Sequence, residues 1–170
     1  MTTEIKTLHL DAVIATHTQD LSAKVAAITG TTSGTGFVCA RELAKLGAKV
    51  LLLNRSSERS KRSFAELKAA VPGATFVPIS CDLQHFASVR KAAELITKEH
   101  GQLDILCNNA GVMALPDEAT KDGYDVQMQT NCLSHFLLTK KLFPLLRKSS
   151  EARGPLGGEV PRQKRRRPWR

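Results

Sequence analysis

The amino-acid sequence predicts an α/β fold in layers, with parallel strands at its centre and helices on both faces. Apolar runs of strand length alternate along the chain with segments of helical periodicity, and the connections between them are short. The strand segments are apolar throughout, as strands covered on both faces require. Right-handed crossovers then join the strands into a parallel sheet.

The first half of the pattern contains two strands and two helices. The apolar run at 24–30 predicts a strand, and a helix is expected at 36–47, where Gly47 suits its C-terminal end. A second strand at 48–55 precedes a helix at 57–70, which Pro72 and Gly73 stop.

The second half repeats this order. A strand is expected at 74–80, where Pro78 indicates an edge position because proline cannot donate to a strand ladder. A helix at 86–101 and a strand at 103–111 follow. The last element is a long helix at 121–147, bent or ended near Pro144.

The expected organisation is one folded unit between two extensions. Residues 1–20 show no firm pattern and are interpreted as a loosely attached N-terminal extension, while 21–148 form the unit. Residues 149–170, rich in proline, glycine and arginine, are expected to be a disordered basic tail. The last twenty residues carry seven basic and two acidic side chains, so they hold +5 of the net charge of +9.

Composition excludes several classes of protein. No apolar run approaches the ~20 residues that a membrane helix needs, and no secretory signal precedes the first strand, so we expect a cytoplasmic protein without a membrane span. The four cysteines, Cys39, Cys81, Cys107 and Cys132, are too widely spaced for a zinc site. They are expected to be buried free thiols, with no metal and no disulfide.

The glycine-rich turn is the main candidate binding element. Gly30, Gly34 and Gly36 lie where the first strand gives way to the first helix. Backbone N–H groups at a helix N-terminus favour an anion, and glycine lets the backbone approach a pyrophosphate. The turn lacks the Gly-Lys-Ser/Thr of a phosphate-loop NTPase. A tight turn with a purely structural role is the alternative.

The second strand ends in Asn54 and Arg55. An acidic residue at this position would hold the ribose 2′-hydroxyl of NAD, whereas arginine can pair with a 2′-phosphate. The pair therefore favours NADP over NAD, with a solvated surface arginine as the alternative.

Four motifs, in order over about residues 22–147, resemble those of the short-chain dehydrogenase/reductase family. The glycine turn resembles the family's cofactor loop, here Thr29, Gly30, Thr32, Ser33, Gly34, Thr35 and Gly36. Asp82 and Leu83 resemble its adenine-contacting pair, and "NNAG" resembles its signature after the fourth strand, with Asn109, Ala110 and Gly111 at the cofactor. The segment "QTNCLSHF" resembles the helix with its catalytic asparagine, here Asn131.

The resemblance implies a Rossmann-type doubly wound sheet, incomplete here, with strand order 3-2-1-4. It also implies hydride transfer between NADP(H) and an alcohol or a carbonyl compound. The wording "CNNAGVMALP", with "LNR", is similar to the branch that acts on retinol-like and other lipophilic alcohols or ketones. Asp82 is expected to cap the following helix, to accept from the adenine amine, or both, and Asn109 to cross-link the sheet.

Asn131 lies in a predicted stripe on one face of the last helix. With a uniform period of 3.6 residues this face holds Tyr124, Met128, Asn131, His135, Leu138 and Leu142, and it should lie on the sheet. A core asparagine requires hydrogen bonds, which a satisfied structural residue or the family's proton relay would each provide. His135 is interpreted as a packed histidine.

The family's catalytic serine and Tyr-x-x-x-Lys cannot be placed in this sequence. Its one tyrosine, Tyr124, precedes Asn131 and is followed four residues later by Met128. The resemblance stops near "SSEAR", so we expect a truncated chain, either genuine or produced by a frame change or gene-model error. The fourth strand would then present an open edge.

Three hypotheses on function follow. The first is an NADP-dependent oxidoreductase represented by its cofactor-binding N-terminal half, whose partner would be a small alcohol or ketone. The second is a catalytically inactive fragment that binds a cofactor or a partner. The least favoured is nucleic-acid binding through the basic tail, because the body of the chain has no basic face. The sequence leaves the oligomeric state open.

Overall fold

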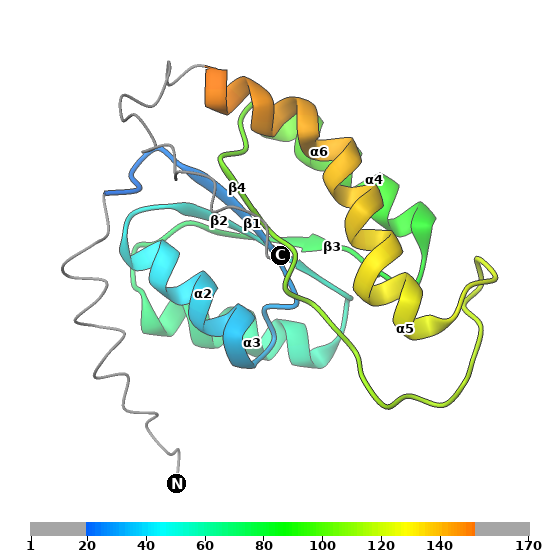
Figure 1. Ribbon diagram of the computed structural model, residues 1–170. Coiled ribbons are helices and arrows are strands. Elements are labelled where there is room, and N and C mark those ends of the chain that lie inside the picture. Colours follow the sequence, from blue (N-terminus) through cyan, green and yellow to red (C-terminus); the bar gives the residue numbers. More distant parts are fainter. Residues whose placement is uncertain (1–19, 152–170) are drawn as a thin grey trace, which may run out of the picture.

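The computed structural model describes residues 20–151, which form one sheet with helices on both of its faces (Figure 1). The predicted extension at 1–20 and the predicted basic tail at 149–170 lie outside the described residues, except for residue 20 and for residues 149–151, which end α6.

The described strands form a parallel sheet in the order β3-β2-β1-β4, which confirms the predicted order. β1 spans Val25–Thr29, β2 Lys49–Asn54, β3 Phe76–Ser80 and β4 Ile105–Cys107. β2 pairs with β1 from Lys49 to Leu53 and with β3 from Val50 to Asn54. Pro78 lies on the edge strand β3, as predicted.

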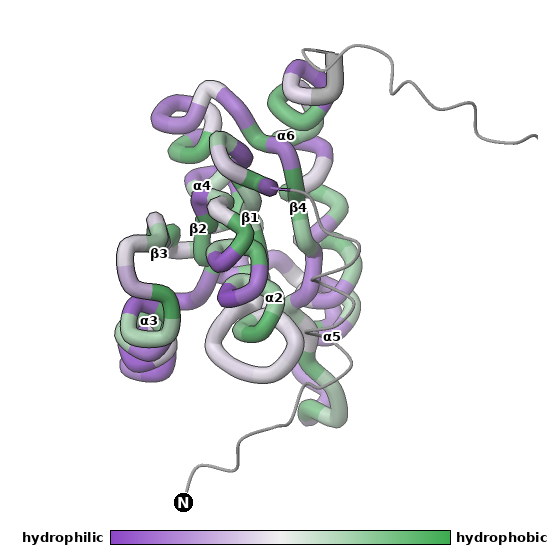
Figure 2. Tube along the Cα trace, turned by 90° about the vertical axis from the view of Figure 1, so that its left-hand side faces the viewer, coloured by the Kyte–Doolittle hydropathy of each residue, from purple (hydrophilic) through white to green (hydrophobic). Residues whose placement is uncertain are grey.

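Alternate strand residues face two separate hydrophobic cores. α2 (Gly34–Lys45) and α3 (Glu58–Ala70) cover one face, where Ile28, Val50 and Leu52 are buried. α4 (Phe86–Glu99) and α6 (Ser134–Glu151) cover the other face, which holds Ala27, Leu51 and Leu53. In Figure 2 the strands β1 and β2 are coloured mainly hydrophobic, and hydrophilic residues are seen on the turns of α3.

β4 is much shorter than predicted. The expected strand at 103–111 contains only three ladder residues, Ile105–Cys107, and all three are partly exposed. The chain leaves the ladder after Cys107, because residues 108–112 are held by side chains of other elements, as described below.

The long helix of 121–147 is corrected in three respects. Residues 121–125 form a turn, and the helical segment begins with α5 (Val126–Met128). It passes through a π-helical segment, η1 (Gln129–Leu133), before α6. Pro144 does not end it, since α6 continues to Glu151, beyond the predicted end of the helix at residue 147.

The π-helical segment explains why the predicted stripe is only half right. A π turn contains one extra residue and rotates the following residues by about 100°. His135, Leu138 and Leu142 are buried as predicted. Met128 and Asn131, which precede or lie in η1, are exposed, because the uniform period of 3.6 does not hold across it. Tyr124 is also exposed, and it lies in the turn at 121–125, outside the helix.

The cysteines are free thiols, as predicted, but only Cys81 is buried. Cys39 and Cys107 are partly exposed and Cys132 is exposed. Burial raises the pKa of the Cys81 thiol to about 12, so this thiol is inert at neutral pH.

Candidate dinucleotide-binding site

The glycine turn connects β1 to α2, and its three glycines are required for two different steric reasons. Gly30 has φ of +72°, and a Cβ there would lie 2.8 Å from the Cα of Ala110. A Cβ on Gly36 would clash with the carbonyl oxygen of Gly30 and with Nδ2 of Asn109. Gly34 has φ of +59° but open space around it. Two glycines therefore allow close packing, and Gly34 allows the turn itself.

The N-terminus of α2 has donors available for an anion. Ser33 occupies the N-cap position with an extended backbone, but its hydroxyl makes no capping hydrogen bond. It accepts a hydrogen bond from the Arg59 guanidinium instead, at 2.5 Å. The first-turn N–H groups, which include those of Thr35 and Gly36, thus have no N-cap side chain to accept from them.

A cavity of about 150 Å³ lies at the carboxyl ends of the strands. It brings together eight of the predicted site residues: Gly30, Thr32, Asn54, Arg55, Asp82, Leu83, Ala110 and Gly111. These residues come from the ends of all four strands. The cavity therefore opens where neighbouring β1 and β4 lead to opposite faces, which is the usual ligand site of such sheets.

Seven further predicted site residues do not line this cavity: Thr29, Ser33, Gly34, Thr35, Gly36, Asn109 and Asn131. Ser33, Gly34, Thr35 and Gly36 begin α2, beside the cavity-lining Thr32. Thr29 and Asn109 lie behind the lining, and Thr29 is fully buried. They support the site through the hydrogen bonds given below.

Asn54 shapes the glycine turn. Its Oδ1 accepts from the backbone N–H of Thr31 at 2.9 Å, and its Nδ2 donates to the Thr31 hydroxyl at 2.7 Å. The end of β2 is thereby tied to the segment that follows β1. The neutral amide serves here because it both donates and accepts, which a carboxylate cannot do.

Arg59 was not identified from the sequence, although it lines the cavity with Arg55. It lies in the first turn of α3, whereas Arg55 lies in the loop between β2 and α3. The guanidinium of Arg59 donates to the hydroxyl of Ser33 at the start of α2. Asp82 is the single carboxylate among the described lining residues, so this end of the cavity is positively charged.

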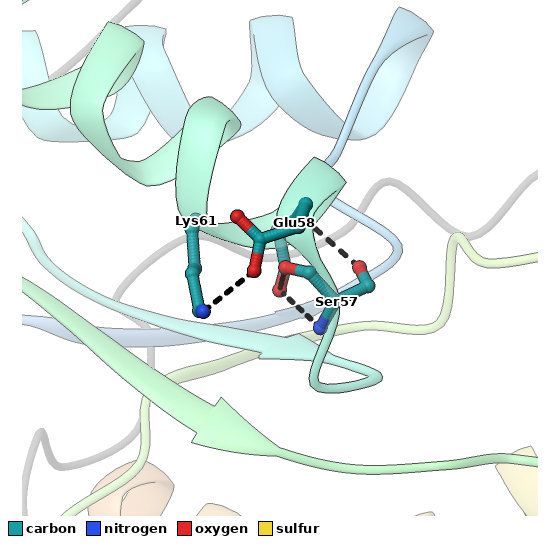
Figure 3. Close-up of polar contacts among 4 residues, drawn as sticks. Ser57, Glu58 and Lys61 are labelled. Atoms are coloured by element: carbon teal, nitrogen blue, oxygen red, sulfur yellow. Dashed lines mark hydrogen bonds and ion pairs between the residues drawn. The ribbon is translucent and has the colours of Figure 1, made fainter.

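The start of α3 is a capping box (Figure 3). The Ser57 hydroxyl accepts from the Ser60 N–H, and the Ser60 hydroxyl accepts from the Ser57 N–H, both at 3.1 Å. Lys61 donates to Glu58 at 2.6 Å. Because Ser57 also lines the cavity, the helix that carries Arg59 begins at a fixed point of the cavity wall.

Asp82 does not cap α4. Its Oδ1 accepts from the Gln84 N–H at 2.9 Å in a local turn, and the N-cap residue of α4 is His85. Asp122 occupies the capping role from a distant turn, since its Oδ2 accepts from the Phe86 N–H at 2.7 Å. This hydrogen bond lowers the pKa of the Asp122 carboxyl.

Asn109 cross-links the sheet, as predicted. Its Nδ2 donates to the carbonyl oxygens of Thr29 at 2.9 Å and Gly30 at 3.1 Å. The Thr29 hydroxyl in turn accepts from the N–H groups of Asn109 and Ala110, both at 3.0 Å. These bonds hold the segment after β4 against the end of β1, where no strand ladder continues.

Asn131 is exposed in η1, so it is not the core asparagine that the stripe predicts. Its amide is nevertheless satisfied. Nδ2 donates to the carbonyl oxygen of Val112 at 2.8 Å, and Oδ1 accepts from the Val112 N–H at 2.9 Å. Because Val112 lines the cavity, Asn131 fixes the far wall of the site.

The described residues contain no group of three or more His, Cys, Asp or Glu side chains that could hold a metal ion. Within the same part of the chain, no helix is long and apolar enough to cross a membrane.

Comparison with known proteins identifies what this arrangement resembles. Residues 24–154 match the family model described as short chain dehydrogenase. The chain is 45% identical over 132 residues to an uncharacterized oxidoreductase of Schizosaccharomyces pombe, and 39% identical over 133 residues to bovine retinol dehydrogenase 12. Each alignment covers 78% of this chain but only 39% and 42% of the relative. The chain therefore spans about two fifths of these curated relatives.

Solved structures show the same fold with two different dinucleotides. RhlG of Pseudomonas aeruginosa, described as an NADP active-site complex, superposes with a TM-score of 0.64 at 32% identity, over 76% of this chain and 50% of that one. The 3-ketoacyl-(acyl-carrier-protein) reductase of Brucella melitensis, complexed with NADH, gives a TM-score of 0.63 at 32% identity, over 78% and 53%.

Proposed function

Because this chain belongs to the short-chain dehydrogenase family, we propose that its residues 21–148 form a unit that binds a nicotinamide adenine dinucleotide. The observation that carries the proposal is the cavity at the carboxyl ends of the strands. Its rim combines a glycine turn, a helix N-terminus without a side-chain cap, and two arginines. This donor set fits the negative charge of a pyrophosphate.

The proposed contacts follow the chemistry of each rim segment. The N–H groups that begin α2 would bind the pyrophosphate. Asp82 and Leu83 line the part of the cavity where the adenine would lie, and Ala110 and Gly111 line the opposite part, toward the nicotinamide ribose. Gly30 and Gly36 pack the turn closely, and Gly34 leaves open space on its outer side. Once bound, the dinucleotide would supply the hydride of the family's oxidoreductase chemistry.

We propose that the dinucleotide is NADP rather than NAD. The support is the positive end of the cavity, where Arg55 and Arg59 lie with Ser57 and no carboxylate ends β2. Two guanidinium groups can pair with a ribose 2′-phosphate, whereas NAD offers only hydroxyls there. The solved relatives, with one NADP and one NADH complex, are compatible with either dinucleotide.

Calorimetric titration with NADPH and NADH tests this preference. We expect Arg55→Gln and Arg59→Gln each to weaken NADPH binding about tenfold or more, the cost of one charge-assisted hydrogen bond, and to leave NADH binding within about twofold. Lys61→Gln is the matched control, because Lys61 is exposed and pairs with Glu58. Equal losses for both dinucleotides would contradict the assignment.

The reaction of the whole family-length protein is proposed to be hydride transfer between NADP(H) and a small alcohol or ketone. Similarity to bovine retinol dehydrogenase 12 supports a lipophilic substrate. Asn131 is proposed as its catalytic asparagine, although in this structure its amide holds Val112. The 170-residue chain itself carries one tyrosine and no Tyr-x-x-x-Lys.

We therefore propose that this chain binds the dinucleotide without turning it over. The assay follows NADPH absorbance with retinaldehyde and with a short-chain ketone, at saturating NADPH. The expected result is binding without oxidation above the rate measured in the absence of the protein. Sustained NADPH oxidation by the purified chain would contradict it.

We also propose the cytoplasmic location expected from the sequence. All four cysteines lie within the described residues and are free thiols, which suits a reducing compartment. Fractionation of cells that express the chain tests this, and recovery with the membrane pellet after a salt wash would contradict it.

A further inference from the structure

A buried histidine lies behind the proposed dinucleotide cavity. His135 belongs to the first turn of α6 and is 6% exposed. Its Nδ1 lies 3.2 Å from the carbonyl oxygen of Asn131 in η1, and its Nε2 lies 2.9 Å from the hydroxyl of Thr29 at the end of β1. The ring thus connects η1 to the end of β1.

The partners of the ring determine where its proton lies. A carbonyl oxygen only accepts, so Nδ1 must carry the hydrogen that faces Asn131. In a neutral ring Nε2 is then an acceptor, and the Thr29 hydroxyl must donate to it. That hydroxyl accepts the N–H groups of Asn109 and Ala110, so its single proton remains free for Nε2.

The competing acceptor for the same proton is more distant. The carbonyl oxygen of Cys107 lies 3.4 Å from the Thr29 hydroxyl, compared with 2.9 Å for Nε2 of His135. Burial of the ring lowers the pKa of His135, which favours the neutral form that this pattern requires. Donor and acceptor are therefore assigned for every hydrogen bond from the Asn131 carbonyl to the Thr29 hydroxyl.

The two ends of this chain of hydrogen bonds hold neighbouring residues of one cavity wall, Ala110 and Val112. At one end the Thr29 hydroxyl fixes the amide of Ala110, which packs against Gly30. At the other end the residue whose carbonyl accepts from the ring, Asn131, holds Val112. Ala110, Gly30 and Val112 all line the cavity.

We propose that His135 is a positioning residue of the dinucleotide site: as a neutral, Nδ1-protonated ring it couples the Asn131 carbonyl of η1 to the Thr29 hydroxyl that holds Asn109 and Ala110. The hydrogen-bond assignment stands on the geometry alone. Its effect on dinucleotide affinity rests on the proposed function.

The first experiment observes the ring itself. Nitrogen NMR of the chain with ¹⁵N-labelled histidine should show His135 with a protonated Nδ1 and an unprotonated Nε2 at neutral pH. Thr29→Val removes the donor to Nε2, so the Nε2 resonance should shift and Nδ1 should stay protonated. Thr29→Ser keeps the hydroxyl and should retain the wild-type signature. An Nε2-protonated or charged ring in the wild type would overturn the assignment.

The second experiment measures NADPH affinity in two variants, each of which keeps only one of the two hydrogen bonds of His135. His135→Gln can still accept from Thr29 through its amide oxygen, whereas His135→Asn can still donate to the Asn131 carbonyl but is too short to reach Thr29. We expect His135→Gln to bind within about threefold of wild type and His135→Asn about tenfold more weakly, the scale of one buried hydrogen bond and its unpaired partner.

The matched control is His100→Gln, because His100 is also buried but lies at the far end of α4 with its Nδ1 near Lys49. It should leave NADPH affinity unchanged. Equal affinity in His135→Asn and His135→Gln would overturn the positioning role while leaving the proposed function intact. Absence of NADPH binding in the folded wild-type chain would refute the proposed function and the affinity effect, and the nitrogen signature would then decide the hydrogen-bond assignment alone.

Discussion

The two sides of the cavity are held in place by different forces. On one side β2 is paired with β1 and with β3 along almost its whole length, and Leu51 and Leu52 are buried. On the other side β4 pairs with β1 through only three residues, all partly exposed. Beyond Cys107 the wall is held by side chains that bind backbone, those of Thr29, Asn109 and Asn131.

This difference teaches where sequence can vary. A ladder inside an apolar core tolerates any side chain of suitable volume and hydrophobicity. A wall held by side-chain hydrogen bonds requires particular atoms at particular positions, since a lost partner leaves a polar group unpaired. The loss of buried apolar side-chain volume should therefore be costly at β2, and the loss of hydrogen-bonding side chains should be costly beside β4.

The largest expected effect is at the point where the two sides meet. Gly36→Val would place side-chain atoms against the Gly30 carbonyl and the Asn109 amide, and backbone cannot move aside cheaply. We expect a loss of about 4 kcal/mol or more in the free energy of unfolding, measured by urea denaturation.

Gly34→Ala is the control for this glycine. A methyl group on residue 34 would enter open space, and only the positive φ disfavours it, so this substitution should cost about 1 kcal/mol of stability. Similar losses for the two variants would mean that the close contact at Gly36 does not constrain the turn.

The second largest effect distinguishes β2 from β4. Leu51→Ala removes a fully buried side chain from the centre of the sheet and should cost about 3 kcal/mol in urea denaturation. Ile105→Ala, on the partly exposed β4, should cost about 1 kcal/mol. A loss at Ile105 as large as that at Leu51 would show that β4 is supported by its core contacts after all.

The third effect concerns the polar side. Asn109→Ala removes two hydrogen bonds to the carbonyls of Thr29 and Gly30, and we expect a loss of about 2 kcal/mol in stability together with weaker NADPH binding. Asn108→Ala is the neighbouring control. Asn108 is exposed and donates to Thr139 at 2.9 Å, so it should cost below about 1 kcal/mol. Equal losses of stability for the two variants would show that the hydrogen bonds of Asn109 do not hold this wall.

The smallest expected effect is a dependence of stability on pH. Burial lowers the pKa of His135 below its ordinary value of 6.5. Between the folded-state pKa and pH 6.5, the imidazole is protonated in the unfolded chain but neutral in the folded chain. The full stability is therefore present above pH 6.5, and it declines as the pH falls toward the folded-state pKa. The decline is at most about 1.4 kcal/mol per pH unit for one histidine.

Urea denaturation at pH 7.5 and 5.5 checks this prediction. His100, whose pKa is also lowered by burial, contributes to the same trend. The comparison is therefore between wild type and His135→Gln, which should lose less stability on acidification. An identical pH dependence in the two proteins would contradict a buried neutral ring.

The same comparison explains which parts of the fold sequence patterns predict. Apolar runs such as that of β2 define the strands, and Pro78 at an edge follows from its missing N–H. The order β3-β2-β1-β4 was expected from the family resemblance and is confirmed. The short β4 was not predicted, because the predicted strand included the polar segment 108–111, whereas the ladder ends at Cys107 and that segment is held by side-chain hydrogen bonds.

The site shows the same division. The rim residues at strand ends could be expected from their motifs, and eight of them do line one cavity. The π-helical segment could not, since no local pattern in 129–133 marks its extra residue or the pairing of Asn131 with Val112. Arg59 was missed because its contact with Ser33 depends on how α3 is placed after β2, which no local pattern in the sequence indicates.

Amide chemical shifts in the ¹⁵N-labelled chain, recorded during titration with NADPH, test the central claim most directly. If the cavity holds the dinucleotide between its two sides, the amides of Gly34–Gly36, Arg55 and Asp82 should shift together with those of Ala110–Val112, and all should saturate at one concentration. No shifts in a folded chain, or shifts confined to residues 152–170, would contradict it.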